Sequence, residues 1–209
     1  MRIRPGIYNN RHLERSDGGK TRFGVGAAGR YSVLKQDALC AMPVQGICDP
    51  QGCMLFLWAT WPCLPEAMHV MQAWGFRYIT LAFLWVKVNR NNGEPFFGIG
   101  YYTKSNSEPC LLGVRGDPVK LSNSVSQILL APEMVVHPRL EHSEKPALAR
   151  ERIVQLCGDV PRVELFSRHR VEGWYMVGNE IDGRDIRDVL PEMTRSIRLD
   201  AALGGLLDA

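Results

Sequence analysis

The feature that most constrains the fold is an alternation of strand-length apolar runs with a segment of helical spacing. CMLFLWAT (53–60) is a continuous apolar run, and YITLAFLWVKV (78–88) is a second one rich in aromatic and β-branched residues. Between them, LPEAMHVMQAWGF (64–76) places apolar residues at helical spacing, and Gly75 is positioned to end the helix. A strand, a crossover helix and a second strand predict a right-handed βαβ unit with parallel pairing.

The rest of the chain continues this alternation. The helix predicted at 142–158 has Ser143 as its cap and Pro146 in its first turn, and Gly158 stops it. The other predicted elements are strands at 108–116, 127–131, 160–166 and 174–178, and a short helix at 181–190. This order predicts the α/β class with a doubly wound sheet, whose ligands bind beyond the carboxyl ends of the strands.

Length and composition are those of one globular domain. The chain has 209 residues, 45% hydrophobic and 22% charged, and we predict a single domain over residues 1–190. Residues 191–209 are interpreted as a frayed tail, with a short terminal helix as the alternative. No stretch is suited to crossing a membrane, and the start lacks an apolar signal-peptide run, which favours the cytoplasm. The six cysteines form no C-x-x-C pair, so we expect reduced, structural cysteines and no metal site.

Charge is unevenly distributed along the chain. The formal net charge is +3, yet residues 1–35 hold eight Lys or Arg and two Asp or Glu. Such a basic segment is suited to meeting the phosphates of a nucleic acid. A solvated N-terminal arm is the equally weighted alternative.

Polar residues next to the ends of the predicted strands and helices are the site candidates in such a fold. A lysine at a helix start opposes the helix dipole and invites an anion, and a carboxylate after a strand-end glycine often holds ribose hydroxyls. Each candidate also has a plain alternative as a solvated side chain or a turn residue. The candidates are Asn106, Glu108, Lys145, Arg168, His169, Asn179 and Glu180.

The order of the motifs carries more information than any one motif. LFLWAT, LPEAMHVMQAWGF, FLWVKVN, FFGIGYYTKSNSEPCLLGVRG, HSEKP, GDVPRVELFSR and GW-x-x-x-GNE follow one another in a single run. With these motifs the chain closely resembles the adenine methyltransferase family typified by the seventy-kilodalton subunit of RNA adenosine methyltransferase, in particular its bacterial and phage members. The resemblance covers roughly residues 8–183.

The resemblance implies a Rossmann-like fold with permuted motif order that binds S-adenosylmethionine and methylates the 6-amino group of adenine in nucleic acid. It also implies roles for individual residues, position by position. They are Lys145 at the methionine carboxylate of the cofactor, Arg168 and His169 at its sugar and tail, Asn179 and Glu180 at its ribose and adenine, and Asn106 and Glu108 beside the methyl-transfer site.

The signature of the family is Asp-Pro-Pro followed by an aromatic residue, at the carboxyl end of a strand. The Asp and the next prolyl carbonyl accept the two hydrogens of the adenine amine, a poor nucleophile that must be held in line with the methyl group. Aligning IYNNR (7–11) with segments that follow the signature predicts that it occupies Ile3, Arg4, Pro5 and Gly6. We therefore expect Ile3 at the Asp position and expect the N-terminal strand of the sheet to be missing. Asp49 and Pro50 precede a strand, so they are excluded as the signature.

Rival functions remain open from the sequence. The intact cofactor-side residues favour a methyltransferase, and the bacterial and phage character of the resemblance favours DNA as its substrate. The altered signature favours an inactive or N-terminally shortened homologue that binds nucleic acid or a partner methyltransferase subunit. A nucleotide-binding fold with an unrelated ligand is a third hypothesis.

Overall fold

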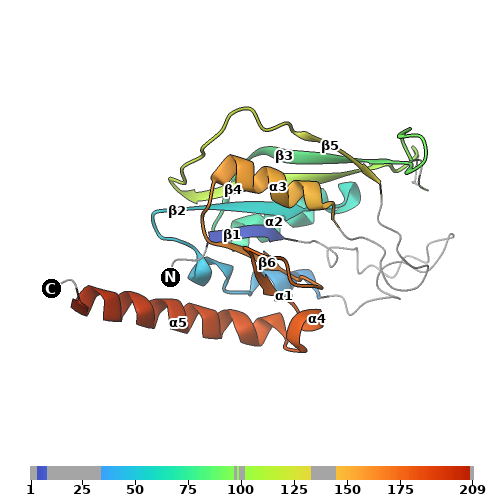
Figure 1. Cartoon of the computed structure of the whole chain (residues 1–209). Helices are drawn as coiled ribbons and strands as arrows, with labels where there is room; N and C mark the ends of the chain where they lie inside the picture. The colour runs from blue at the N-terminus through green and yellow to red at the C-terminus, as the bar shows by residue number, and fades with distance from the viewer. Residues whose placement is uncertain (1–3, 9–33, 97, 99–101, 133–144, 208–209) are drawn as a thin grey trace.

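A computed structural model describes residues 4–8, 34–96, 98, 102–132 and 145–207, which form one mixed sheet with helices on both faces (Figure 1). The strands are β1 (Arg4–Tyr8), β2 (Gly52–Trp58), β3 (Arg77–Val88), β4 (Ser107–Gly116), β5 (Ile128–Pro132), β6 (Arg162–Leu165) and β7 (Tyr175–Val177). The helices are α1 (Gln36–Cys40), α2 (Leu64–Ala73), α3 (Ala147–Cys157), α4 (Asn179–Asp182) and α5 (Ile186–Leu207), with 3₁₀ turns η2 (Val44–Ile47) and η3 (Trp61–Cys63). The predicted α/β class is confirmed.

The sheet order is β5-β3-β4-β2-β1-β6-β7, and β4 is antiparallel to both of its neighbours. The prediction that β2 and β3 pair with each other is therefore wrong, although the two strands do run in the same direction. After β3, the chain returns as β4 and takes the place between them, because an antiparallel partner needs no second crossover helix. As a result, β2, β3, β6 and β7 end at the same edge of the sheet at which β4 begins. We call this the carboxyl edge.

The expectation that the N-terminal strand is missing is also wrong. β1 lies between β2 and β6 and is parallel to both, with Ile7 paired to Phe56 and Arg4 to Arg162. A vacant position there would leave the backbone groups of two strands without partners, and the N-terminal residues supply them. Arg4, Pro5 and Gly6 consequently lie inside a strand instead of following one, while Ile3 lies outside the described residues.

Two hydrophobic cores cover the two faces of the sheet. One packs β2 and β6 against α1, α2 and α5, and includes Leu55, Leu57 and the fully buried Trp74. The other packs Trp58 and Trp85 of the sheet against Ala149 and Ile153 of α3. Figure 1 shows α3 on one side of the sheet and α1 and α5 on the other. The six cysteines are free thiols, as predicted.

The C-terminal residues form a helix where the sequence favoured a frayed tail. The helix predicted at 181–190 is divided at Gly183, which has a φ of +77°, and the second part continues as α5 to Leu207. Leu190 and Thr194 of α5 are buried, and a Cβ on Gly46 would lie 2.5 Å from the Thr194 hydroxyl. Close packing on η2 therefore holds this helix in place. In the part of the chain that the structure describes, no helix is long and apolar enough to cross a membrane.

Candidate functional site

A largely buried carboxylate lies at the centre of the site. Glu108 is the second residue of β4, opposite Trp85 of β3, and its side chain is 12% exposed. Lys87 approaches one carboxylate oxygen, with 2.8 Å between its Nζ and Oε1, and Lys145 donates a short hydrogen bond to Oε2. The two lysines come from the end of β3 and from the segment just before α3. Three segments distant in sequence thus meet at the carboxyl edge.

Opposing influences set the charge of Glu108. Burial raises the pKa of its carboxyl group, and the positive charges and hydrogen bonds of Lys145 and Lys87 together outweigh burial and lower the pKa to about 2. Glu108 is therefore ionised at neutral pH. One carboxylate beside two lysines leaves the group with a formal charge of +1, which is suited to an anion.

Two tryptophan rings line the same place. The Nζ of Lys145 lies 5.6 Å from the Trp58 ring centroid and 5.7 Å from that of Trp85, and the two rings meet edge to face at 6.4 Å. Trp85 Nε1 donates to the Ala131 carbonyl at 2.9 Å. Trp58 Nε1 is buried and has no hydrogen-bond acceptor among the described residues. A buried donor beside a cation fits an oxygen-bearing ligand.

Asn106 belongs to the same group through its backbone. Its carbonyl accepts a hydrogen bond of 2.8 Å from the Lys87 amide, and its side chain is half-buried. The neighbouring Ser107 hydroxyl accepts from Trp61 Nε1 at 3.1 Å. The sequence predicted Asn106, Glu108 and Lys145 and missed Lys87 and the tryptophans. A lone lysine inside the apolar run FLWVKV was the signal that could have found Lys87.

The other predicted residues gather farther along the carboxyl edge. Arg168 follows β6 and Glu180 follows β7, and they form an ion pair with 3.0 Å between Nε and Oε1. Burial lowers the pKa of Arg168, and Glu180 opposes this shift. Gly178 allows the segments after β6 and β7 to approach each other, since a Cβ there would lie 2.1 Å from the Ser167 carbonyl oxygen.

His169 and Asn179 are exposed beside this ion pair. The His169 carbonyl accepts from the Ser167 hydroxyl at 3.0 Å, and Asn179 is the first residue of α4. The seven predicted residues thus form two groups, one around Glu108 and one around the pair Arg168–Glu180. The strands β2 and β1 lie between β4 and β6, so about 14 Å separates the two groups across the sheet.

Comparison with known proteins identifies the family. The family model described as MT-A70 matches residues 10–180. The chain belongs to the MT-A70 family. This family has a Rossmann-like fold, and its members include adenine N6 methyltransferases that depend on S-adenosylmethionine. The predicted family is therefore confirmed.

Several curated relatives match most of this chain. It is 32% identical over 162 residues to the type II methyltransferase M.MunI of Mycoplasma sp., covering 77% of this chain and 64% of that protein. It is 26% identical to the human N(6)-adenosine-methyltransferase catalytic subunit METTL3, covering 76% and 26%. It is 28% identical to the human N(6)-adenine-specific methyltransferase METTL4, covering 75% and 34%. The chain thus spans under two thirds of the length of each of these relatives.

Proposed function

We propose that this MT-A70 domain binds S-adenosylmethionine along the carboxyl edge and transfers its methyl group to the 6-amino group of adenine in DNA. The observation that carries the proposal is the placement of the two residue groups at one edge. A surplus positive charge lies at one end and a carboxylate with an amide at the other. A nucleoside joined to an amino-acid chain, which is the form of this cofactor, is long enough to reach both.

The cofactor-side roles follow from the chemistry of each residue. Lys145 binds the methionine carboxylate, because it is the cation of the group around Glu108 that also faces both tryptophan rings. Asn179 and Glu180 bind the ribose and adenine, since an exposed carboxylate and amide accept from hydroxyl and amine groups. Arg168 and His169 lie beside the sugar and tail, with Arg168 also orienting Glu180.

Methyl transfer depends more on the position of the adenine amine relative to the methyl group than on a strong base. The cofactor supplies a methyl group already activated as a sulfonium. Asn106 and Glu108 flank the place of transfer, where ionised Glu108 adds an acceptor near the incoming amine. The adenine base must leave its helix to reach this edge, and the basic segment 1–35 is suited to holding the phosphates of the nucleic acid.

A second function is favoured by one observation. The residues aligned with the signature hold no carboxylate. Arg4, Pro5 and Gly6 also begin β1, whereas the family signature lies at the carboxyl end of its strand. A domain that lacks the acceptor for the amine loses a contact worth on the order of a hundredfold in rate. The alternative function is accordingly a cofactor-binding homologue without catalysis, which binds nucleic acid or a partner methyltransferase subunit.

One set of assays separates these functions. The full chain is titrated with S-adenosylmethionine in a calorimeter, and transfer of labelled methyl is measured on unmethylated DNA and on RNA of the same sequence. Cofactor binding with transfer to DNA supports the enzyme, and binding without transfer supports the inactive homologue. Transfer to RNA alone rejects DNA as the substrate.

Paired variants show whether the site is the one described. Lys145→Gln removes the proposed carboxylate ligand and is expected to weaken cofactor binding ten- to a hundredfold. Arg195→Gln changes an exposed basic residue of α5, outside both groups of predicted residues, and is expected to leave binding unchanged. Equal affinity in both variants would reject the assignment of Lys145.

A further inference from the structure

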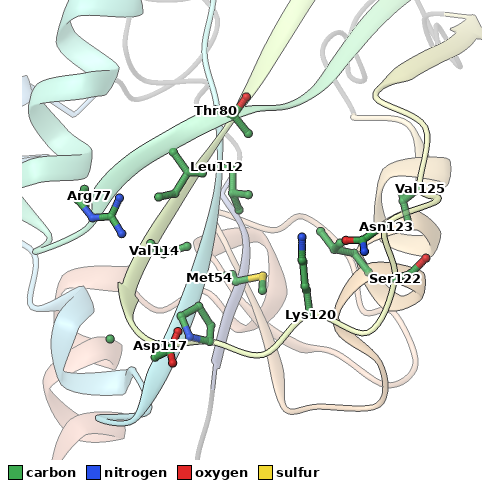
Figure 2. Close-up of a pocket in the computed structure, with 14 residues that line it drawn as sticks. Met54, Arg77, Thr80, Leu112, Val114, Asp117, Lys120, Ser122, Asn123 and Val125 are labelled. Atoms are coloured by element: carbon green, nitrogen blue, oxygen red, sulfur yellow. The ribbon is translucent and has the colours of Figure 1, made fainter.

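An open pocket lies at the edge of the sheet opposite to the carboxyl edge (Figure 2). Its volume is about 470 Å³, within the range of small-molecule sites. Met54 of β2 and Leu112 and Val114 of β4 line one side, and residues of the segment 117–125 line the other. Met54 and Trp58 are four residues apart on β2, so about 13 Å separates this pocket from the group around Glu108.

The segment that forms the outer wall is held in place along its length. A Cβ on Gly52 would lie 2.5 Å from the backbone nitrogen of Pro118, which shows how closely the segment packs on β2. Two hydrogen bonds anchor it, from Asp117 N to Gln51 O at 2.9 Å and from Leu121 N to Leu156 O at 2.8 Å. Two more hold the residues that follow it, from Arg152 Nη1 to Ser126 O at 2.6 Å and from Gln127 Nε2 to Leu81 O at 2.6 Å. The pocket is therefore preformed, and little ordering is needed when a ligand binds.

One part of the lining is apolar and only partly covered. Met54, Leu112, Val114, Val125 and Leu156 are all half-buried, and each contributes to the pocket surface. Figure 2 shows Met54, Leu112 and Val114 together on the sheet side, with Val125 across from them. Uncovered apolar area of this kind favours a ligand with a flat hydrocarbon or aromatic body.

The other part of the lining is positively charged. Arg77 and Lys120 are exposed, and neither has an ion-pair partner among the residues that the structure describes. In Figure 2 the Lys120 side chain extends into the pocket between Met54 and Asn123. Asp117 is the single acidic residue in the lining, so the formal charge is +1. Ser122 and Asn123 add hydrogen-bond donors at the rim.

We propose that this pocket is a second binding site, for a small aromatic anion such as a nucleoside monophosphate. The aromatic body lies on Met54, Leu112 and Val114, and the anionic group lies between Arg77 and Lys120. The site does not depend on the function proposed for the carboxyl edge, because the two share no residue.

The probe for the first test is anilinonaphthalene sulfonate, an aromatic anion that fluoresces when it leaves water. It is titrated into the full chain and into Lys120→Gln and Arg77→Gln. We expect one equivalent to bind, and each variant to bind about tenfold more weakly, because each loses one charge-assisted contact. Lys104→Gln and Arg195→Gln are the matched controls, since both residues are exposed and lie outside the pocket, and both are expected to bind the probe as the unmodified chain does. Equal affinity of all five proteins would overturn the proposal.

Two further measurements test the aromatic part of the ligand. A nucleoside monophosphate is expected to displace the probe, and inorganic phosphate at the same concentration is not. Val125→Glu places a negative charge on the half-buried apolar surface and is expected to abolish probe binding by the folded protein, whose folding is checked by circular dichroism. Displacement by phosphate alone, or undiminished binding by folded Val125→Glu, would show that the pocket is not a site for aromatic anions.

Discussion

Two carboxylates on the same side of the sheet, one buried and one largely buried, meet different partners. Glu164 of β6 is 3% exposed, and Arg150 of α3 binds both of its oxygens, at 2.6 Å and 3.0 Å. Glu108 of β4 instead meets two lysines from separate segments. Arginine matches a carboxylate with two parallel hydrogen bonds and balances its charge, which leaves nothing for a ligand. The group around Glu108 keeps one positive charge in surplus. The formal charge therefore distinguishes the two groups: the structural pair of Glu164 and Arg150 is neutral, and the group around Glu108 is positive.

The largest expected effect comes from breaking the structural pair. Glu164→Ala removes the carboxylate that binds the largely buried Arg150 guanidinium, so the free energy of unfolding should fall by about 4 kcal/mol. Chemical denaturation measures this change. The double variant Arg150→Met, Glu164→Leu is the control, and it should recover most of the loss because no charge remains buried. A loss below about 1 kcal/mol in Glu164→Ala would contradict a structural role.

The next effect is the acid sensitivity that Glu108 confers. Its pKa of about 2 lies below the ordinary 4.5, so the folded state favours the ionised form. This contribution is complete above about pH 4.5 and is lost as the pH falls towards 2, and at most roughly 3 kcal/mol is involved. Unfolding is measured across this range for the unmodified chain and Glu108→Gln. Asp185, whose pKa Arg187 also lowers to about 2, titrates in both proteins, so the difference isolates Glu108. If the free energy of unfolding depends on pH in the same way in both proteins, the lowered pKa of Glu108 is refuted.

Lys87→Gln removes one positive charge from the group around Glu108. The group then has no net charge, like the Arg150–Glu164 pair. Glu108 then has Lys145 as its one cation, and Lys145 is less available to a cofactor carboxylate. We expect S-adenosylmethionine to bind about tenfold more weakly, which corresponds to about 1.4 kcal/mol. Calorimetric titration measures the affinity, with Lys104→Gln, an exposed lysine before β4, as the control. Unchanged affinity of Lys87→Gln for S-adenosylmethionine would show that Lys87 does not contribute to the site.

The smallest effect on stability is expected at the exposed pair. Glu180 is 51% exposed in its ion pair with Arg168, so Glu180→Gln should change the free energy of unfolding by less than about 0.5 kcal/mol. The same variant should weaken cofactor binding severalfold, because a carboxylate accepts from ribose hydroxyls more strongly than an amide does. Denaturation and titration of one sample test both statements. A large loss of stability with unchanged binding would make this pair structural, like Glu164 and Arg150.

Much of the architecture could be read from local patterns. The apolar runs predicted β2, β3 and β4, helical spacing predicted α2, and the cap and stop residues predicted α3. The predicted start of α3 was wrong, because the helix begins at Ala147 with Pro146 at its N-cap. Gly158 ends α3 with a φ of +76°, as expected. The length of α5 was missed, although Leu190, Met193 and Ile197 recur at helical spacing and pack on the core. An apolar run predicts a strand but not the direction or the position of that strand in the sheet. The sequence therefore did not predict that β4 lies between β2 and β3 and is antiparallel to both.

The sequence by itself determined the family, the succession of strands and helices, and the types of residue available for a site, because these depend on local order along the chain. Only the tertiary structure decided that Glu108 and Lys145, which the sequence assigned to different tasks, contact each other directly. It also decided that Lys87 joins them and that β1 lies inside the sheet, between β2 and β6. Such contacts arise from strand register and from backbone groups that must find partners across the sheet, and neither is encoded in any single segment.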